Sequence, residues 1–252
     1  MRVVALDTTG REGSVALVEG QRVVAERRGD ASRTHAERLP TEILTLLESG
    51  GVDLTEIDLF AVAAGPGSFT GLRIGIATIQ GLAFVHGRRV AAVSALEALV
   101  HAADGGLRPG ALVGAWMDAQ RGEVFTALYR VAVAPPFAAE RLIELESPSV
   151  CEPVRALVQW SSLIANEPVL FVGDGATAYR SVIGSRVPAA EIMAPPPLAG
   201  TIGLMGVSMA ASDQAVDPAA VRPLYVRRPD AEIARDKRVH AAKEEPQPER
   251  RR

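Results

Sequence analysis

Apolar and polar positions along the first third of the chain predict three strands followed by a helix. Short β-prone runs at residues 3–6, 14–18 and 21–27 are joined by turn-rich segments at 8–13 and 19–20. Apolar residues then recur at helical spacing from residue 39 to 47. The chain therefore opens with a strand meander that leads into an amphipathic helix.

The signals at the two ends of this helix define its extent. Thr34 and Glu37 have the spacing of a capping box, and Gly50–Gly51 supplies a stop. Pro40 lies inside the pattern, so we expect a kink or a start nearer that residue, because proline removes one helical hydrogen bond.

The remaining pattern repeats the same order of elements. A buried strand at 59–64, a helix at 68–85, a strand at 90–93 and a helix at 94–103 complete a first βββαβαβα unit. Strands at 112–117, 124–131, 141–145 and 169–172, with helices at 153–164, 177–183 and 198–211, indicate a second. Two such units in tandem predict an α/β protein with a duplicated ribonuclease-H-like fold, as in the actin, sugar-kinase and Hsp70 superfamily (ASKHA).

The same pattern suggests how the chain divides. We expect a first subdomain at 1–104, completed by the helix at 198–212, and a second, smaller one at 105–197. An extended segment at 213–231 and a disordered charged tail at 232–252 follow.

Composition excludes several classes of protein. A net charge of −3, from 27 Lys and Arg against 30 Asp and Glu, argues against a strongly basic nucleic-acid binder that works alone. A single cysteine excludes an internal disulfide framework and a cysteine zinc site. The absence of a signal peptide or a spanning segment predicts a cytoplasmic protein without membrane contact.

Carboxylates at strand ends are the first candidate chemistry. Asp7, with Thr8 and Thr9, ends the first strand, and Asp118 holds the matching place in the second half. In this architecture such carboxylates would face a cleft and hold hydrated Mg²⁺ beside nucleotide phosphates. The alternative is that they cap turn amides. Likewise, Gly173 to Gly175 either lets a ligand approach the backbone or forms an ordinary strand-to-helix turn.

Residues 65–75 (GPGSFTGLRIG) form the most informative stretch. They lack the ending of a phosphate loop and the spacing of a nucleophile elbow. Gly71, Gly75 and Thr78 share one helix face with Gly81 nearby, although glycine costs about 1 kcal/mol relative to alanine inside a helix. We expect a close approach of another backbone to offset this cost, and the pattern favours a tightly packed helix pair, within the chain or between chains, over core packing alone.

Five segments together resemble the TsaB family, the dimerisation subunit of the bacterial tRNA threonylcarbamoyladenosine machinery. The resemblance covers residues 1–231 in order. It rests on DTT at 7–9, HAERL at 35–39, the stretch 65–75, MDAQRGEV at 117–124 and PLYVR at 223–227. One departure is Gln120, where the family usually has arginine.

The resemblance implies an accessory role in a tRNA modification. In that pathway a separate enzyme makes threonylcarbamoyl-adenylate, and TsaD, a paralogue, transfers the group to N6 of adenosine 37 in tRNAs that read codons beginning with A. TsaB would bind TsaD directly, with the ATPase TsaE joining, and would contact tRNA only indirectly. It would hold no cofactor of its own, with ATP or ADP and Mg²⁺ at the joint with TsaD.

The resemblance also assigns residues. TsaD holds its metal with two helix histidines at i and i+4, whereas here Leu39 follows His35, which implies an inactive relative without a metal. The partner interface, for TsaD or for a second copy in its absence, would comprise His35, Leu39, Ile43, Leu46, Leu47, Gly71, Leu72, Ile74, Gly75, Thr78 and Ile79. A vestigial nucleotide cleft would comprise Asp7, Thr8, Thr9, Asp118, Arg121, Gly173, Asp174 and Gly175.

Other functions have weaker support. An ATP-dependent kinase would use Asp7 and Asp118 around Mg-ATP, but no evident catalytic base accompanies them. A ribonuclease-H-like nuclease needs more carboxylates around two metals than the strand at 59–64 offers. For a peptidase, Ser68, His35 and Asp7 do not form a recognisable triad by spacing.

Overall fold

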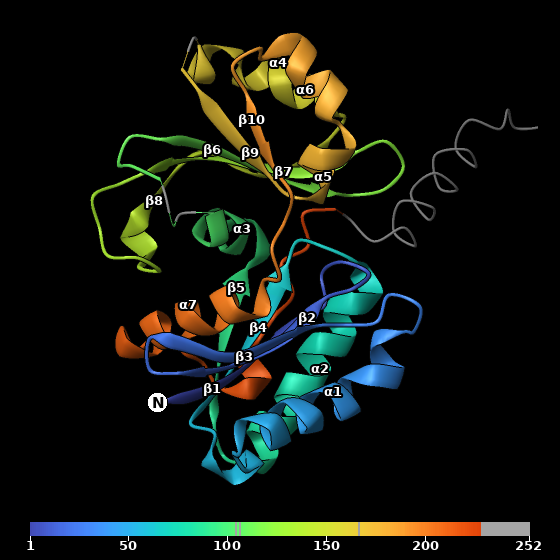
Figure 1. Cartoon of the computed structure of the whole chain (residues 1–252), viewed down its shortest axis with the longest axis vertical. Coiled ribbons are helices and arrows are strands. Elements are labelled where there is room, and N and C mark those ends of the chain that lie inside the picture. Colours follow the sequence, from blue (N-terminus) through green and yellow to red (C-terminus); the bar gives the residue numbers. More distant parts are fainter. Residues whose placement is uncertain (104, 106, 166, 228–252) are drawn as a thin grey trace, which may run out of the picture.

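Two mixed sheets of five strands, one above the other, organise the protein (Figure 1). The computed structural model describes residues 1–103, 105, 107–165 and 167–227. The first sheet has the order β3-β2-β1-β4-β5. Its strands are β1 (Arg2–Asp7), β2 (Ser14–Glu19), β3 (Arg22–Arg28), β4 (Leu59–Gly65) and β5 (Arg89–Ser94).

The second sheet repeats the topology of the first. Its order is β10-β9-β6-β7-β8, where the first three strands in sequence pair antiparallel and the last two join in parallel. The strands are β6 (Leu112–Asp118), β7 (Val124–Val131), β8 (Leu142–Cys151), β9 (Val169–Val172) and β10 (Glu191–Met193). This repeated order confirms the predicted duplicated α/β fold.

Helices cover the sheets in layers. In the first half, α1 (His35–Gly50) and α2 (Phe69–Val85) lie on one face of the first sheet, and α7 (Ala199–Ala211) lies on the other (Figure 1). The outer face of the second sheet carries α4 (Pro153–Ile164), α5 (Asp174–Ala178) and α6 (Arg180–Arg186). No helix in the described part of the chain combines the length and the apolarity that a membrane crossing would require.

Most predicted elements are present, and three details are corrected. The strand expected at 141–145 extends through Cys151. The single helix expected at 177–183 is two short helices, α5 and α6, and the short strand β10 was not predicted. The tail expected to be disordered at 232–252 lies outside the described residues.

Local signals explain where α1 begins and ends. The Glu37 carboxylate accepts hydrogen bonds from the backbone N–H and the hydroxyl of Thr34, each at 2.7 Å, so the helix begins at His35. Pro40 does not delay this start, because the helix includes it. Gly51 ends the helix in the left-handed conformation, with φ of 63°.

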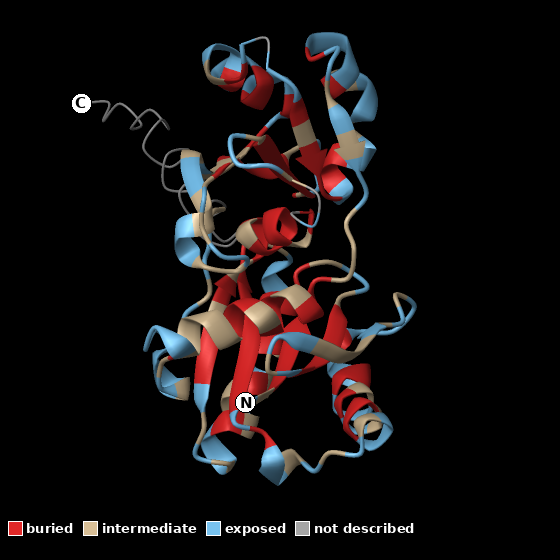
Figure 2. Cartoon of the chain, turned by 60° about the vertical axis from the view of Figure 1, so that its left-hand side comes forward, coloured by how far each residue is buried: buried red, intermediate tan, exposed pale blue. Residues whose placement is uncertain are grey.

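The helix α3 (Ala95–Ala103) lies between the two sheets and belongs to a core that both share. Its buried apolar residues are at most 7% exposed, and Figure 2 shows this central helix almost entirely buried. A helix that is apolar on nearly all sides is stable only when it is buried on all sides. The two halves of the molecule are therefore joined by a continuous hydrophobic core.

The N-terminus of α7 is capped by the first sheet rather than by its own flanking residues. Leu198 precedes the helix and has no side chain that can cap it. Instead, the Ser14 hydroxyl accepts from the amides of Leu198 and Ala199, and a Glu26 carboxylate oxygen accepts from Gly200 at 2.7 Å. These bonds satisfy amides that a buried helix end otherwise leaves unpaired, and they fix α7 on the first sheet.

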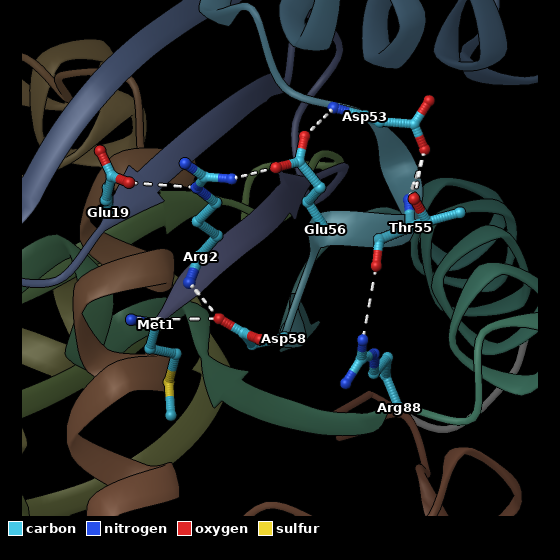
Figure 3. A network of polar contacts seen from close by, with 8 residues as sticks. All are labelled: Met1, Arg2, Glu19, Asp53, Thr55, Glu56, Asp58 and Arg88. Atoms are coloured by element: carbon cyan, nitrogen blue, oxygen red, sulfur yellow. Dashed lines mark hydrogen bonds and ion pairs between the residues drawn. The ribbon is translucent and has the colours of Figure 1, made fainter.

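An ion-pair network joins the start of β1, the end of β2 and the segment before β4 at one edge of the first sheet (Figure 3). The Arg2 guanidinium donates to Glu19 at 3.0 Å and to Glu56 at 2.6 Å, while its backbone N–H donates to Asp58 at 2.8 Å. These side chains are partly exposed, so each pair adds little by itself. Together they link the β1–β2 hairpin to the segment that enters β4.

The glycines of α2 permit a close intramolecular contact. An ideal Cβ on Gly71 would lie 2.1 Å from the Thr8 carbonyl oxygen, and one on Gly75 would lie 2.2 Å from the Thr8 hydroxyl oxygen. The expectation that these glycines serve a tightly packed helix pair is therefore wrong, because they admit the β1–β2 turn of the same chain. Gly81, in contrast, has no atom within 4 Å of the position that a Cβ would take.

Alanine substitutions should separate these two kinds of glycine. We expect Gly75→Ala to destabilise the protein by about 1–3 kcal/mol, because the methyl group overlaps buried Thr8. Gly81→Ala should stabilise it by up to about 1 kcal/mol through helix propensity. Urea denaturation measures both effects, provided that the protein concentration is chosen so that all variants have the same oligomeric state. A Gly75→Ala variant as stable as the parent would contradict the contact.

Candidate functional site

A cavity of about 910 Å³ opens between the two subdomains at the carboxyl ends of the central strands. Thr9 of the β1–β2 turn, Ser68 at the start of α2, and Asp118 and Asp174 of the second subdomain all line it. Ligands of α/β proteins usually bind outside the carboxyl ends of strands. Of the residues expected in a nucleotide cleft, Thr9, Asp118, Arg121 and Asp174 line this cavity, while Asp7 lines a smaller neighbouring cavity.

Asp7 holds a turn. One of its carboxylate oxygens accepts from the Thr9 backbone N–H at 2.9 Å and from the Thr9 hydroxyl at 2.6 Å. The residue is 7% exposed, and this burial raises the pKa of its carboxyl group, an effect that the bonds from Thr9 partly offset. A carboxylate so enclosed stabilises the turn and presents little surface to a hydrated cation.

The two carboxylates of the second subdomain also bind amides. Asp118 accepts from the backbone N–H of Gln120 at 2.8 Å and from its side-chain amide at 2.7 Å. Asp174 accepts from the N–H groups of Asp118 and Gly175 at 2.9 and 2.8 Å, and burial raises the pKa of its carboxyl. Gln120, the residue that departs from the family pattern, therefore holds Asp118 in place.

The glycines flanking Asp174 serve packing and do not open space for a ligand. An ideal Cβ on Gly173 would lie 1.9 Å from the Trp116 carbonyl oxygen, and one on Gly175 would lie 2.8 Å from the Met117 carbonyl carbon. Gly173 also has a φ of 129°, which side-chain-bearing residues rarely adopt. Of the two alternatives raised by the sequence, the geometry favours the strand-to-helix turn.

His35 is part of a buried polar network with Arg38, a residue that sequence reasoning missed. Its Nδ1 accepts from the Arg38 guanidinium at 2.7 Å, so the proton resides on Nε2, which donates to the Gly10 carbonyl at 3.0 Å. Burial and the adjacent Arg38 charge lower the pKa of His35. Arg38 is 2% exposed and also binds Glu42 and the Glu12 carbonyl. The i,i+4 spacing of Arg38 and Glu42 is visible in the sequence and could have indicated this ion pair.

This network limits what His35 can do. Both ring nitrogens are engaged, so neither is directed at Ser68, whose hydroxyl instead accepts from the Gly71 N–H at 3.3 Å. The described residues contain no group of three or more His, Cys, Asp or Glu that could hold a metal ion.

Most of the predicted interface residues lie inside the protein's own core. The expectation that they face a partner is corrected because α1 and α2 use them to cover the first sheet; they are Leu39, Ile43, Leu46, Leu47, Leu72 and Ile79, all at most 4% exposed. His35, Gly71 and Gly75 are buried as well, and Ile74 and Thr78 are half-buried. A charged or large residue at Leu46 or Gly71 would disturb the fold rather than a surface.

A different set of residues forms the exposed side of these helices. We call Ile74, Ala77, Thr78, Gly81, Phe84 and Val85 the outer face of α2, because helical spacing places them opposite the buried residues of that helix. Phe84 is 80% exposed and Val85 77% exposed. On neighbouring α1, Leu44 is 57% exposed. The period of these small and apolar residues was visible in the sequence, but the sequence did not show which side of the helix is covered.

A C-terminal strap, residues 221–227, runs along the cavity and joins the two subdomains. On the first subdomain, the Leu224 N–H donates to the Ala64 carbonyl at 2.7 Å. On the second, Arg227 donates to the Ala119 carbonyl at 2.7 Å, forms an ion pair with Glu123 and lies over the Phe125 ring. The strap therefore borders the cavity where the N-terminus of α2 meets the second sheet.

Comparison with known proteins places this geometry in context. The model of the family TsaD: tRNA N6-adenosine threonylcarbamoyltransferase matches residues 23–235. The chain is 33% identical over 198 residues to the tRNA threonylcarbamoyladenosine biosynthesis protein TsaB of Haemophilus influenzae, which covers 77% of this chain and 81% of that one. These two matches show that the chain has relatives that take part in tRNA modification.

Solved structures agree with the sequence relatives. YeaZ from Pseudomonas aeruginosa is 30% identical, covers 89% of this chain and 99% of its own, and superimposes with a TM-score of 0.72. The activator of the 2-hydroxyisocaproyl-CoA dehydratase from Clostridium difficile, with bound ADPNP, has a TM-score of 0.51 at 11% identity over 85% of this chain and 97% of that one. At that identity the likeness concerns the fold alone.

The role of Asp7 in the turn predicts how its replacement by asparagine behaves. Asparagine keeps the acceptor oxygen and removes a buried charge. The pKa of the Asp7 carboxyl is higher in the folded than in the unfolded protein. Its ionisation therefore lowers the free energy of unfolding as the pH rises through the unfolded-state pKa and then the folded-state pKa. We expect Asp7→Asn to melt higher than the parent at pH 7, with the gap closing toward pH 4.

Asp30→Asn is the matched control. Asp30 accepts from the backbone N–H and hydroxyl of Ser32 with the same geometry, at 2.9 and 2.7 Å, but it is exposed and its pKa is lowered by those bonds. Its replacement should slightly reduce stability at pH 7 and should become neutral in acid. Loss of stability in Asp7→Asn at every pH would show that Asp7 does more than hold this turn.

Proposed function

Because the chain belongs to the TsaB family, we propose that it is the non-catalytic subunit that supports threonylcarbamoyl transfer to adenosine 37 of tRNA in the cytoplasm. In this role it binds a TsaD-type transferase directly, with a TsaE-type ATPase joining the complex. It pairs with a second copy of itself when that partner is absent, and it meets tRNA only through the complex.

The state of the cleft residues supports a non-catalytic role. Asp7, Asp118 and Asp174 each direct carboxylate oxygens at turn amides, and His35 has both ring nitrogens engaged. A general base or a metal ligand needs a lone pair that faces the reactant. Asp118 has both oxygens engaged by Gln120, and Asp7 has one oxygen engaged by Thr9, so these donor sets favour a turn-holding role over that of an independent actin-like kinase.

The observation that carries the proposal is the outer face of α2. A helix that exposes Phe84 and Val85 beside small residues over several turns carries an unusual apolar surface, and α2 contains a single charged residue along its 17 positions. Contiguous apolar surface of this kind marks protein-interaction sites. Small residues at Ala77 and Gly81 allow a partner helix to approach closely, as in ridge-and-groove packing.

The position of this face also suits a shared nucleotide site. The N-terminus of α2 borders the large cavity, so a transferase docked along α2 would reach the cavity mouth. Any ATP or ADP with Mg²⁺ would then lie at the joint, with the partner supplying the metal ligands that this chain directs elsewhere.

A charge on the outer face of α2 should abolish partner binding. We expect Gly81→Glu to weaken binding of the TsaD-type protein of the same organism more than tenfold, because an unpaired carboxylate would be buried in an apolar contact. Gly81 is exposed and a side chain there would meet no other atom, so the fold should be retained. Sedimentation of the chain alone and with the partner measures the effect, and threonylcarbamoyladenosine content of tRNA in a complemented deletion strain reports function.

The matched control is Val158→Glu on α4, which is 57% exposed on the far subdomain and should leave the complex intact. Normal association of Gly81→Glu, with a melting temperature no lower than that of the parent, would refute docking through α2. A chain that neither self-associates nor meets the transferase would refute the accessory role.

A further inference from the structure

Arg73 stands out on α2 because it is the helix's only charged side chain. Over the helix from Phe69 to Val85 every other residue is uncharged, and Arg73 lies on the exposed side, one turn from the N-terminus. Interfaces between proteins are depleted in charge at their centres but enriched in arginine and aromatic residues. A lone arginine at the end of an apolar helix face therefore has the composition of a binding hot spot.

Two aromatic rings fix the guanidinium in place. The Arg73 Cζ atom lies 3.9 Å from the centroid of the ring of Phe69, which precedes Arg73 by one helical turn. The Arg73 Nε donates to the Tyr225 hydroxyl at 3.1 Å. The Phe69 and Tyr225 rings contact each other at 5.3 Å between centroids. Tyr225 belongs to the strap, which the Leu224–Ala64 hydrogen bond anchors to β4. The side chain is thus held by both α2 and the strap.

The outer edge of the guanidinium is left open. Within the described part of the chain, the two terminal nitrogens of Arg73 have no hydrogen-bond or ion-pair partner. A planar fork with two parallel N–H groups matches the two oxygens of a carboxylate. Because stacking already restricts the rotamer, binding costs less entropy than it would for a mobile arginine.

We propose that Arg73 is the polar anchor of the outer face of α2 and receives the carboxylate of an Asp or Glu side chain of the TsaD-type partner. This inference rests on the proposed function. The outer face of α2 next to Arg73 is made of small and apolar residues, which suits a protein partner.

Charge complementarity favours the transferase over a second copy of the chain. The helix α2 contains no Asp or Glu, and on neighbouring α1 Glu37 holds the Thr34 cap and Glu42 pairs with Arg38, so Glu48 is the one acidic residue of these two helices that a second copy could offer to Arg73. The same arginine then contributes to the preference for the heterologous complex. In that arrangement Tyr225 is a positioning residue, because it acts through Arg73 and need not touch the partner.

Calorimetric titration of the full chain with the TsaD-type protein of the same organism tests the proposal. We expect Arg73→Met to weaken the heterologous complex at least tenfold while the homodimer constant, from sedimentation equilibrium, changes less than threefold. Arg73→Lys should recover only part of the loss, because a lysine lacks the fork. Tyr225→Phe should weaken the affinity for the TsaD-type protein a few-fold. The same substitution should have no further effect on affinity when Arg73→Met is already present.

Controls separate the anchor from general charge and from folding. Arg155→Met removes an exposed arginine from α4, which packs on the second sheet, and should leave affinity unchanged. Melting temperatures of all variants should match the parent. Replacement of partner Asp and Glu residues one by one should reveal one carboxylate whose removal is not additive with Arg73→Met in a double-mutant cycle.

The outcomes distinguish this inference from the function on which it rests. If Gly81→Glu abolishes binding but Arg73→Met does not weaken it, or if no partner carboxylate couples to Arg73, the anchor is refuted and the docking face stands. If neither substitution affects binding, the docking face is refuted together with the anchor. Equal weakening of heterologous and homologous complexes by Arg73→Met would refute its role in partner preference.

Discussion

Burial of α3 between the two sheets is the interaction on which the rest of the structure depends. Its residues contact both sheets and α7, and the core around it is built largely from alanine and valine. Small side chains bring the layers close together, which suits a chain with only 4% aromatic residues. Since the burial of this helix requires both sheets, the two halves form one hydrophobic core and the cleft between them has a defined shape.

The cleft is lined by loops that are held by their own polar groups. Thr8 lies against the glycines of α2, Asp7 holds the amide of Thr9, and Asp118 and Asp174 hold amides of the second subdomain. The residues that a phosphotransferase of this fold would use therefore maintain backbone geometry here. A TsaB-family protein keeps the duplicated α/β architecture in this way while these carboxylates stabilise its turns.

The surface of α2 combines the two features on which the proposed recognition rests. One side of the helix is committed to the first sheet by its glycines and by Leu72 and Ile79, which leaves the small and apolar residues of the outer face exposed. At the N-terminal end of that face, Arg73 is stacked on Phe69 and held by the strap. Apolar contact area and a single oriented charge then lie on one rigid element, where they can provide affinity and partner preference respectively.

The local sequence determined the elements and their order. Capping residues at Thr34 and Glu37, the apolar runs of the strands, and the repeated βββαβαβα order all act over a few residues, so the duplicated α/β fold and the family were predictable. The candidate carboxylates were found as well, because strand ends are visible in the chain. Short elements such as β10, α5 and α6 were missed or merged, since few residues carry their pattern.

Only the tertiary structure decided which face of each helix is covered. Leu46 and Phe84 are both apolar residues on amphipathic helices, yet one is fully buried and the other is 80% exposed. The difference depends on where the sheet and the β1–β2 turn lie, and those contacts join residues far apart in sequence. For the same reason Gly75 and Gly81 look alike in the chain but differ in space: Thr8 approaches one and leaves the other exposed.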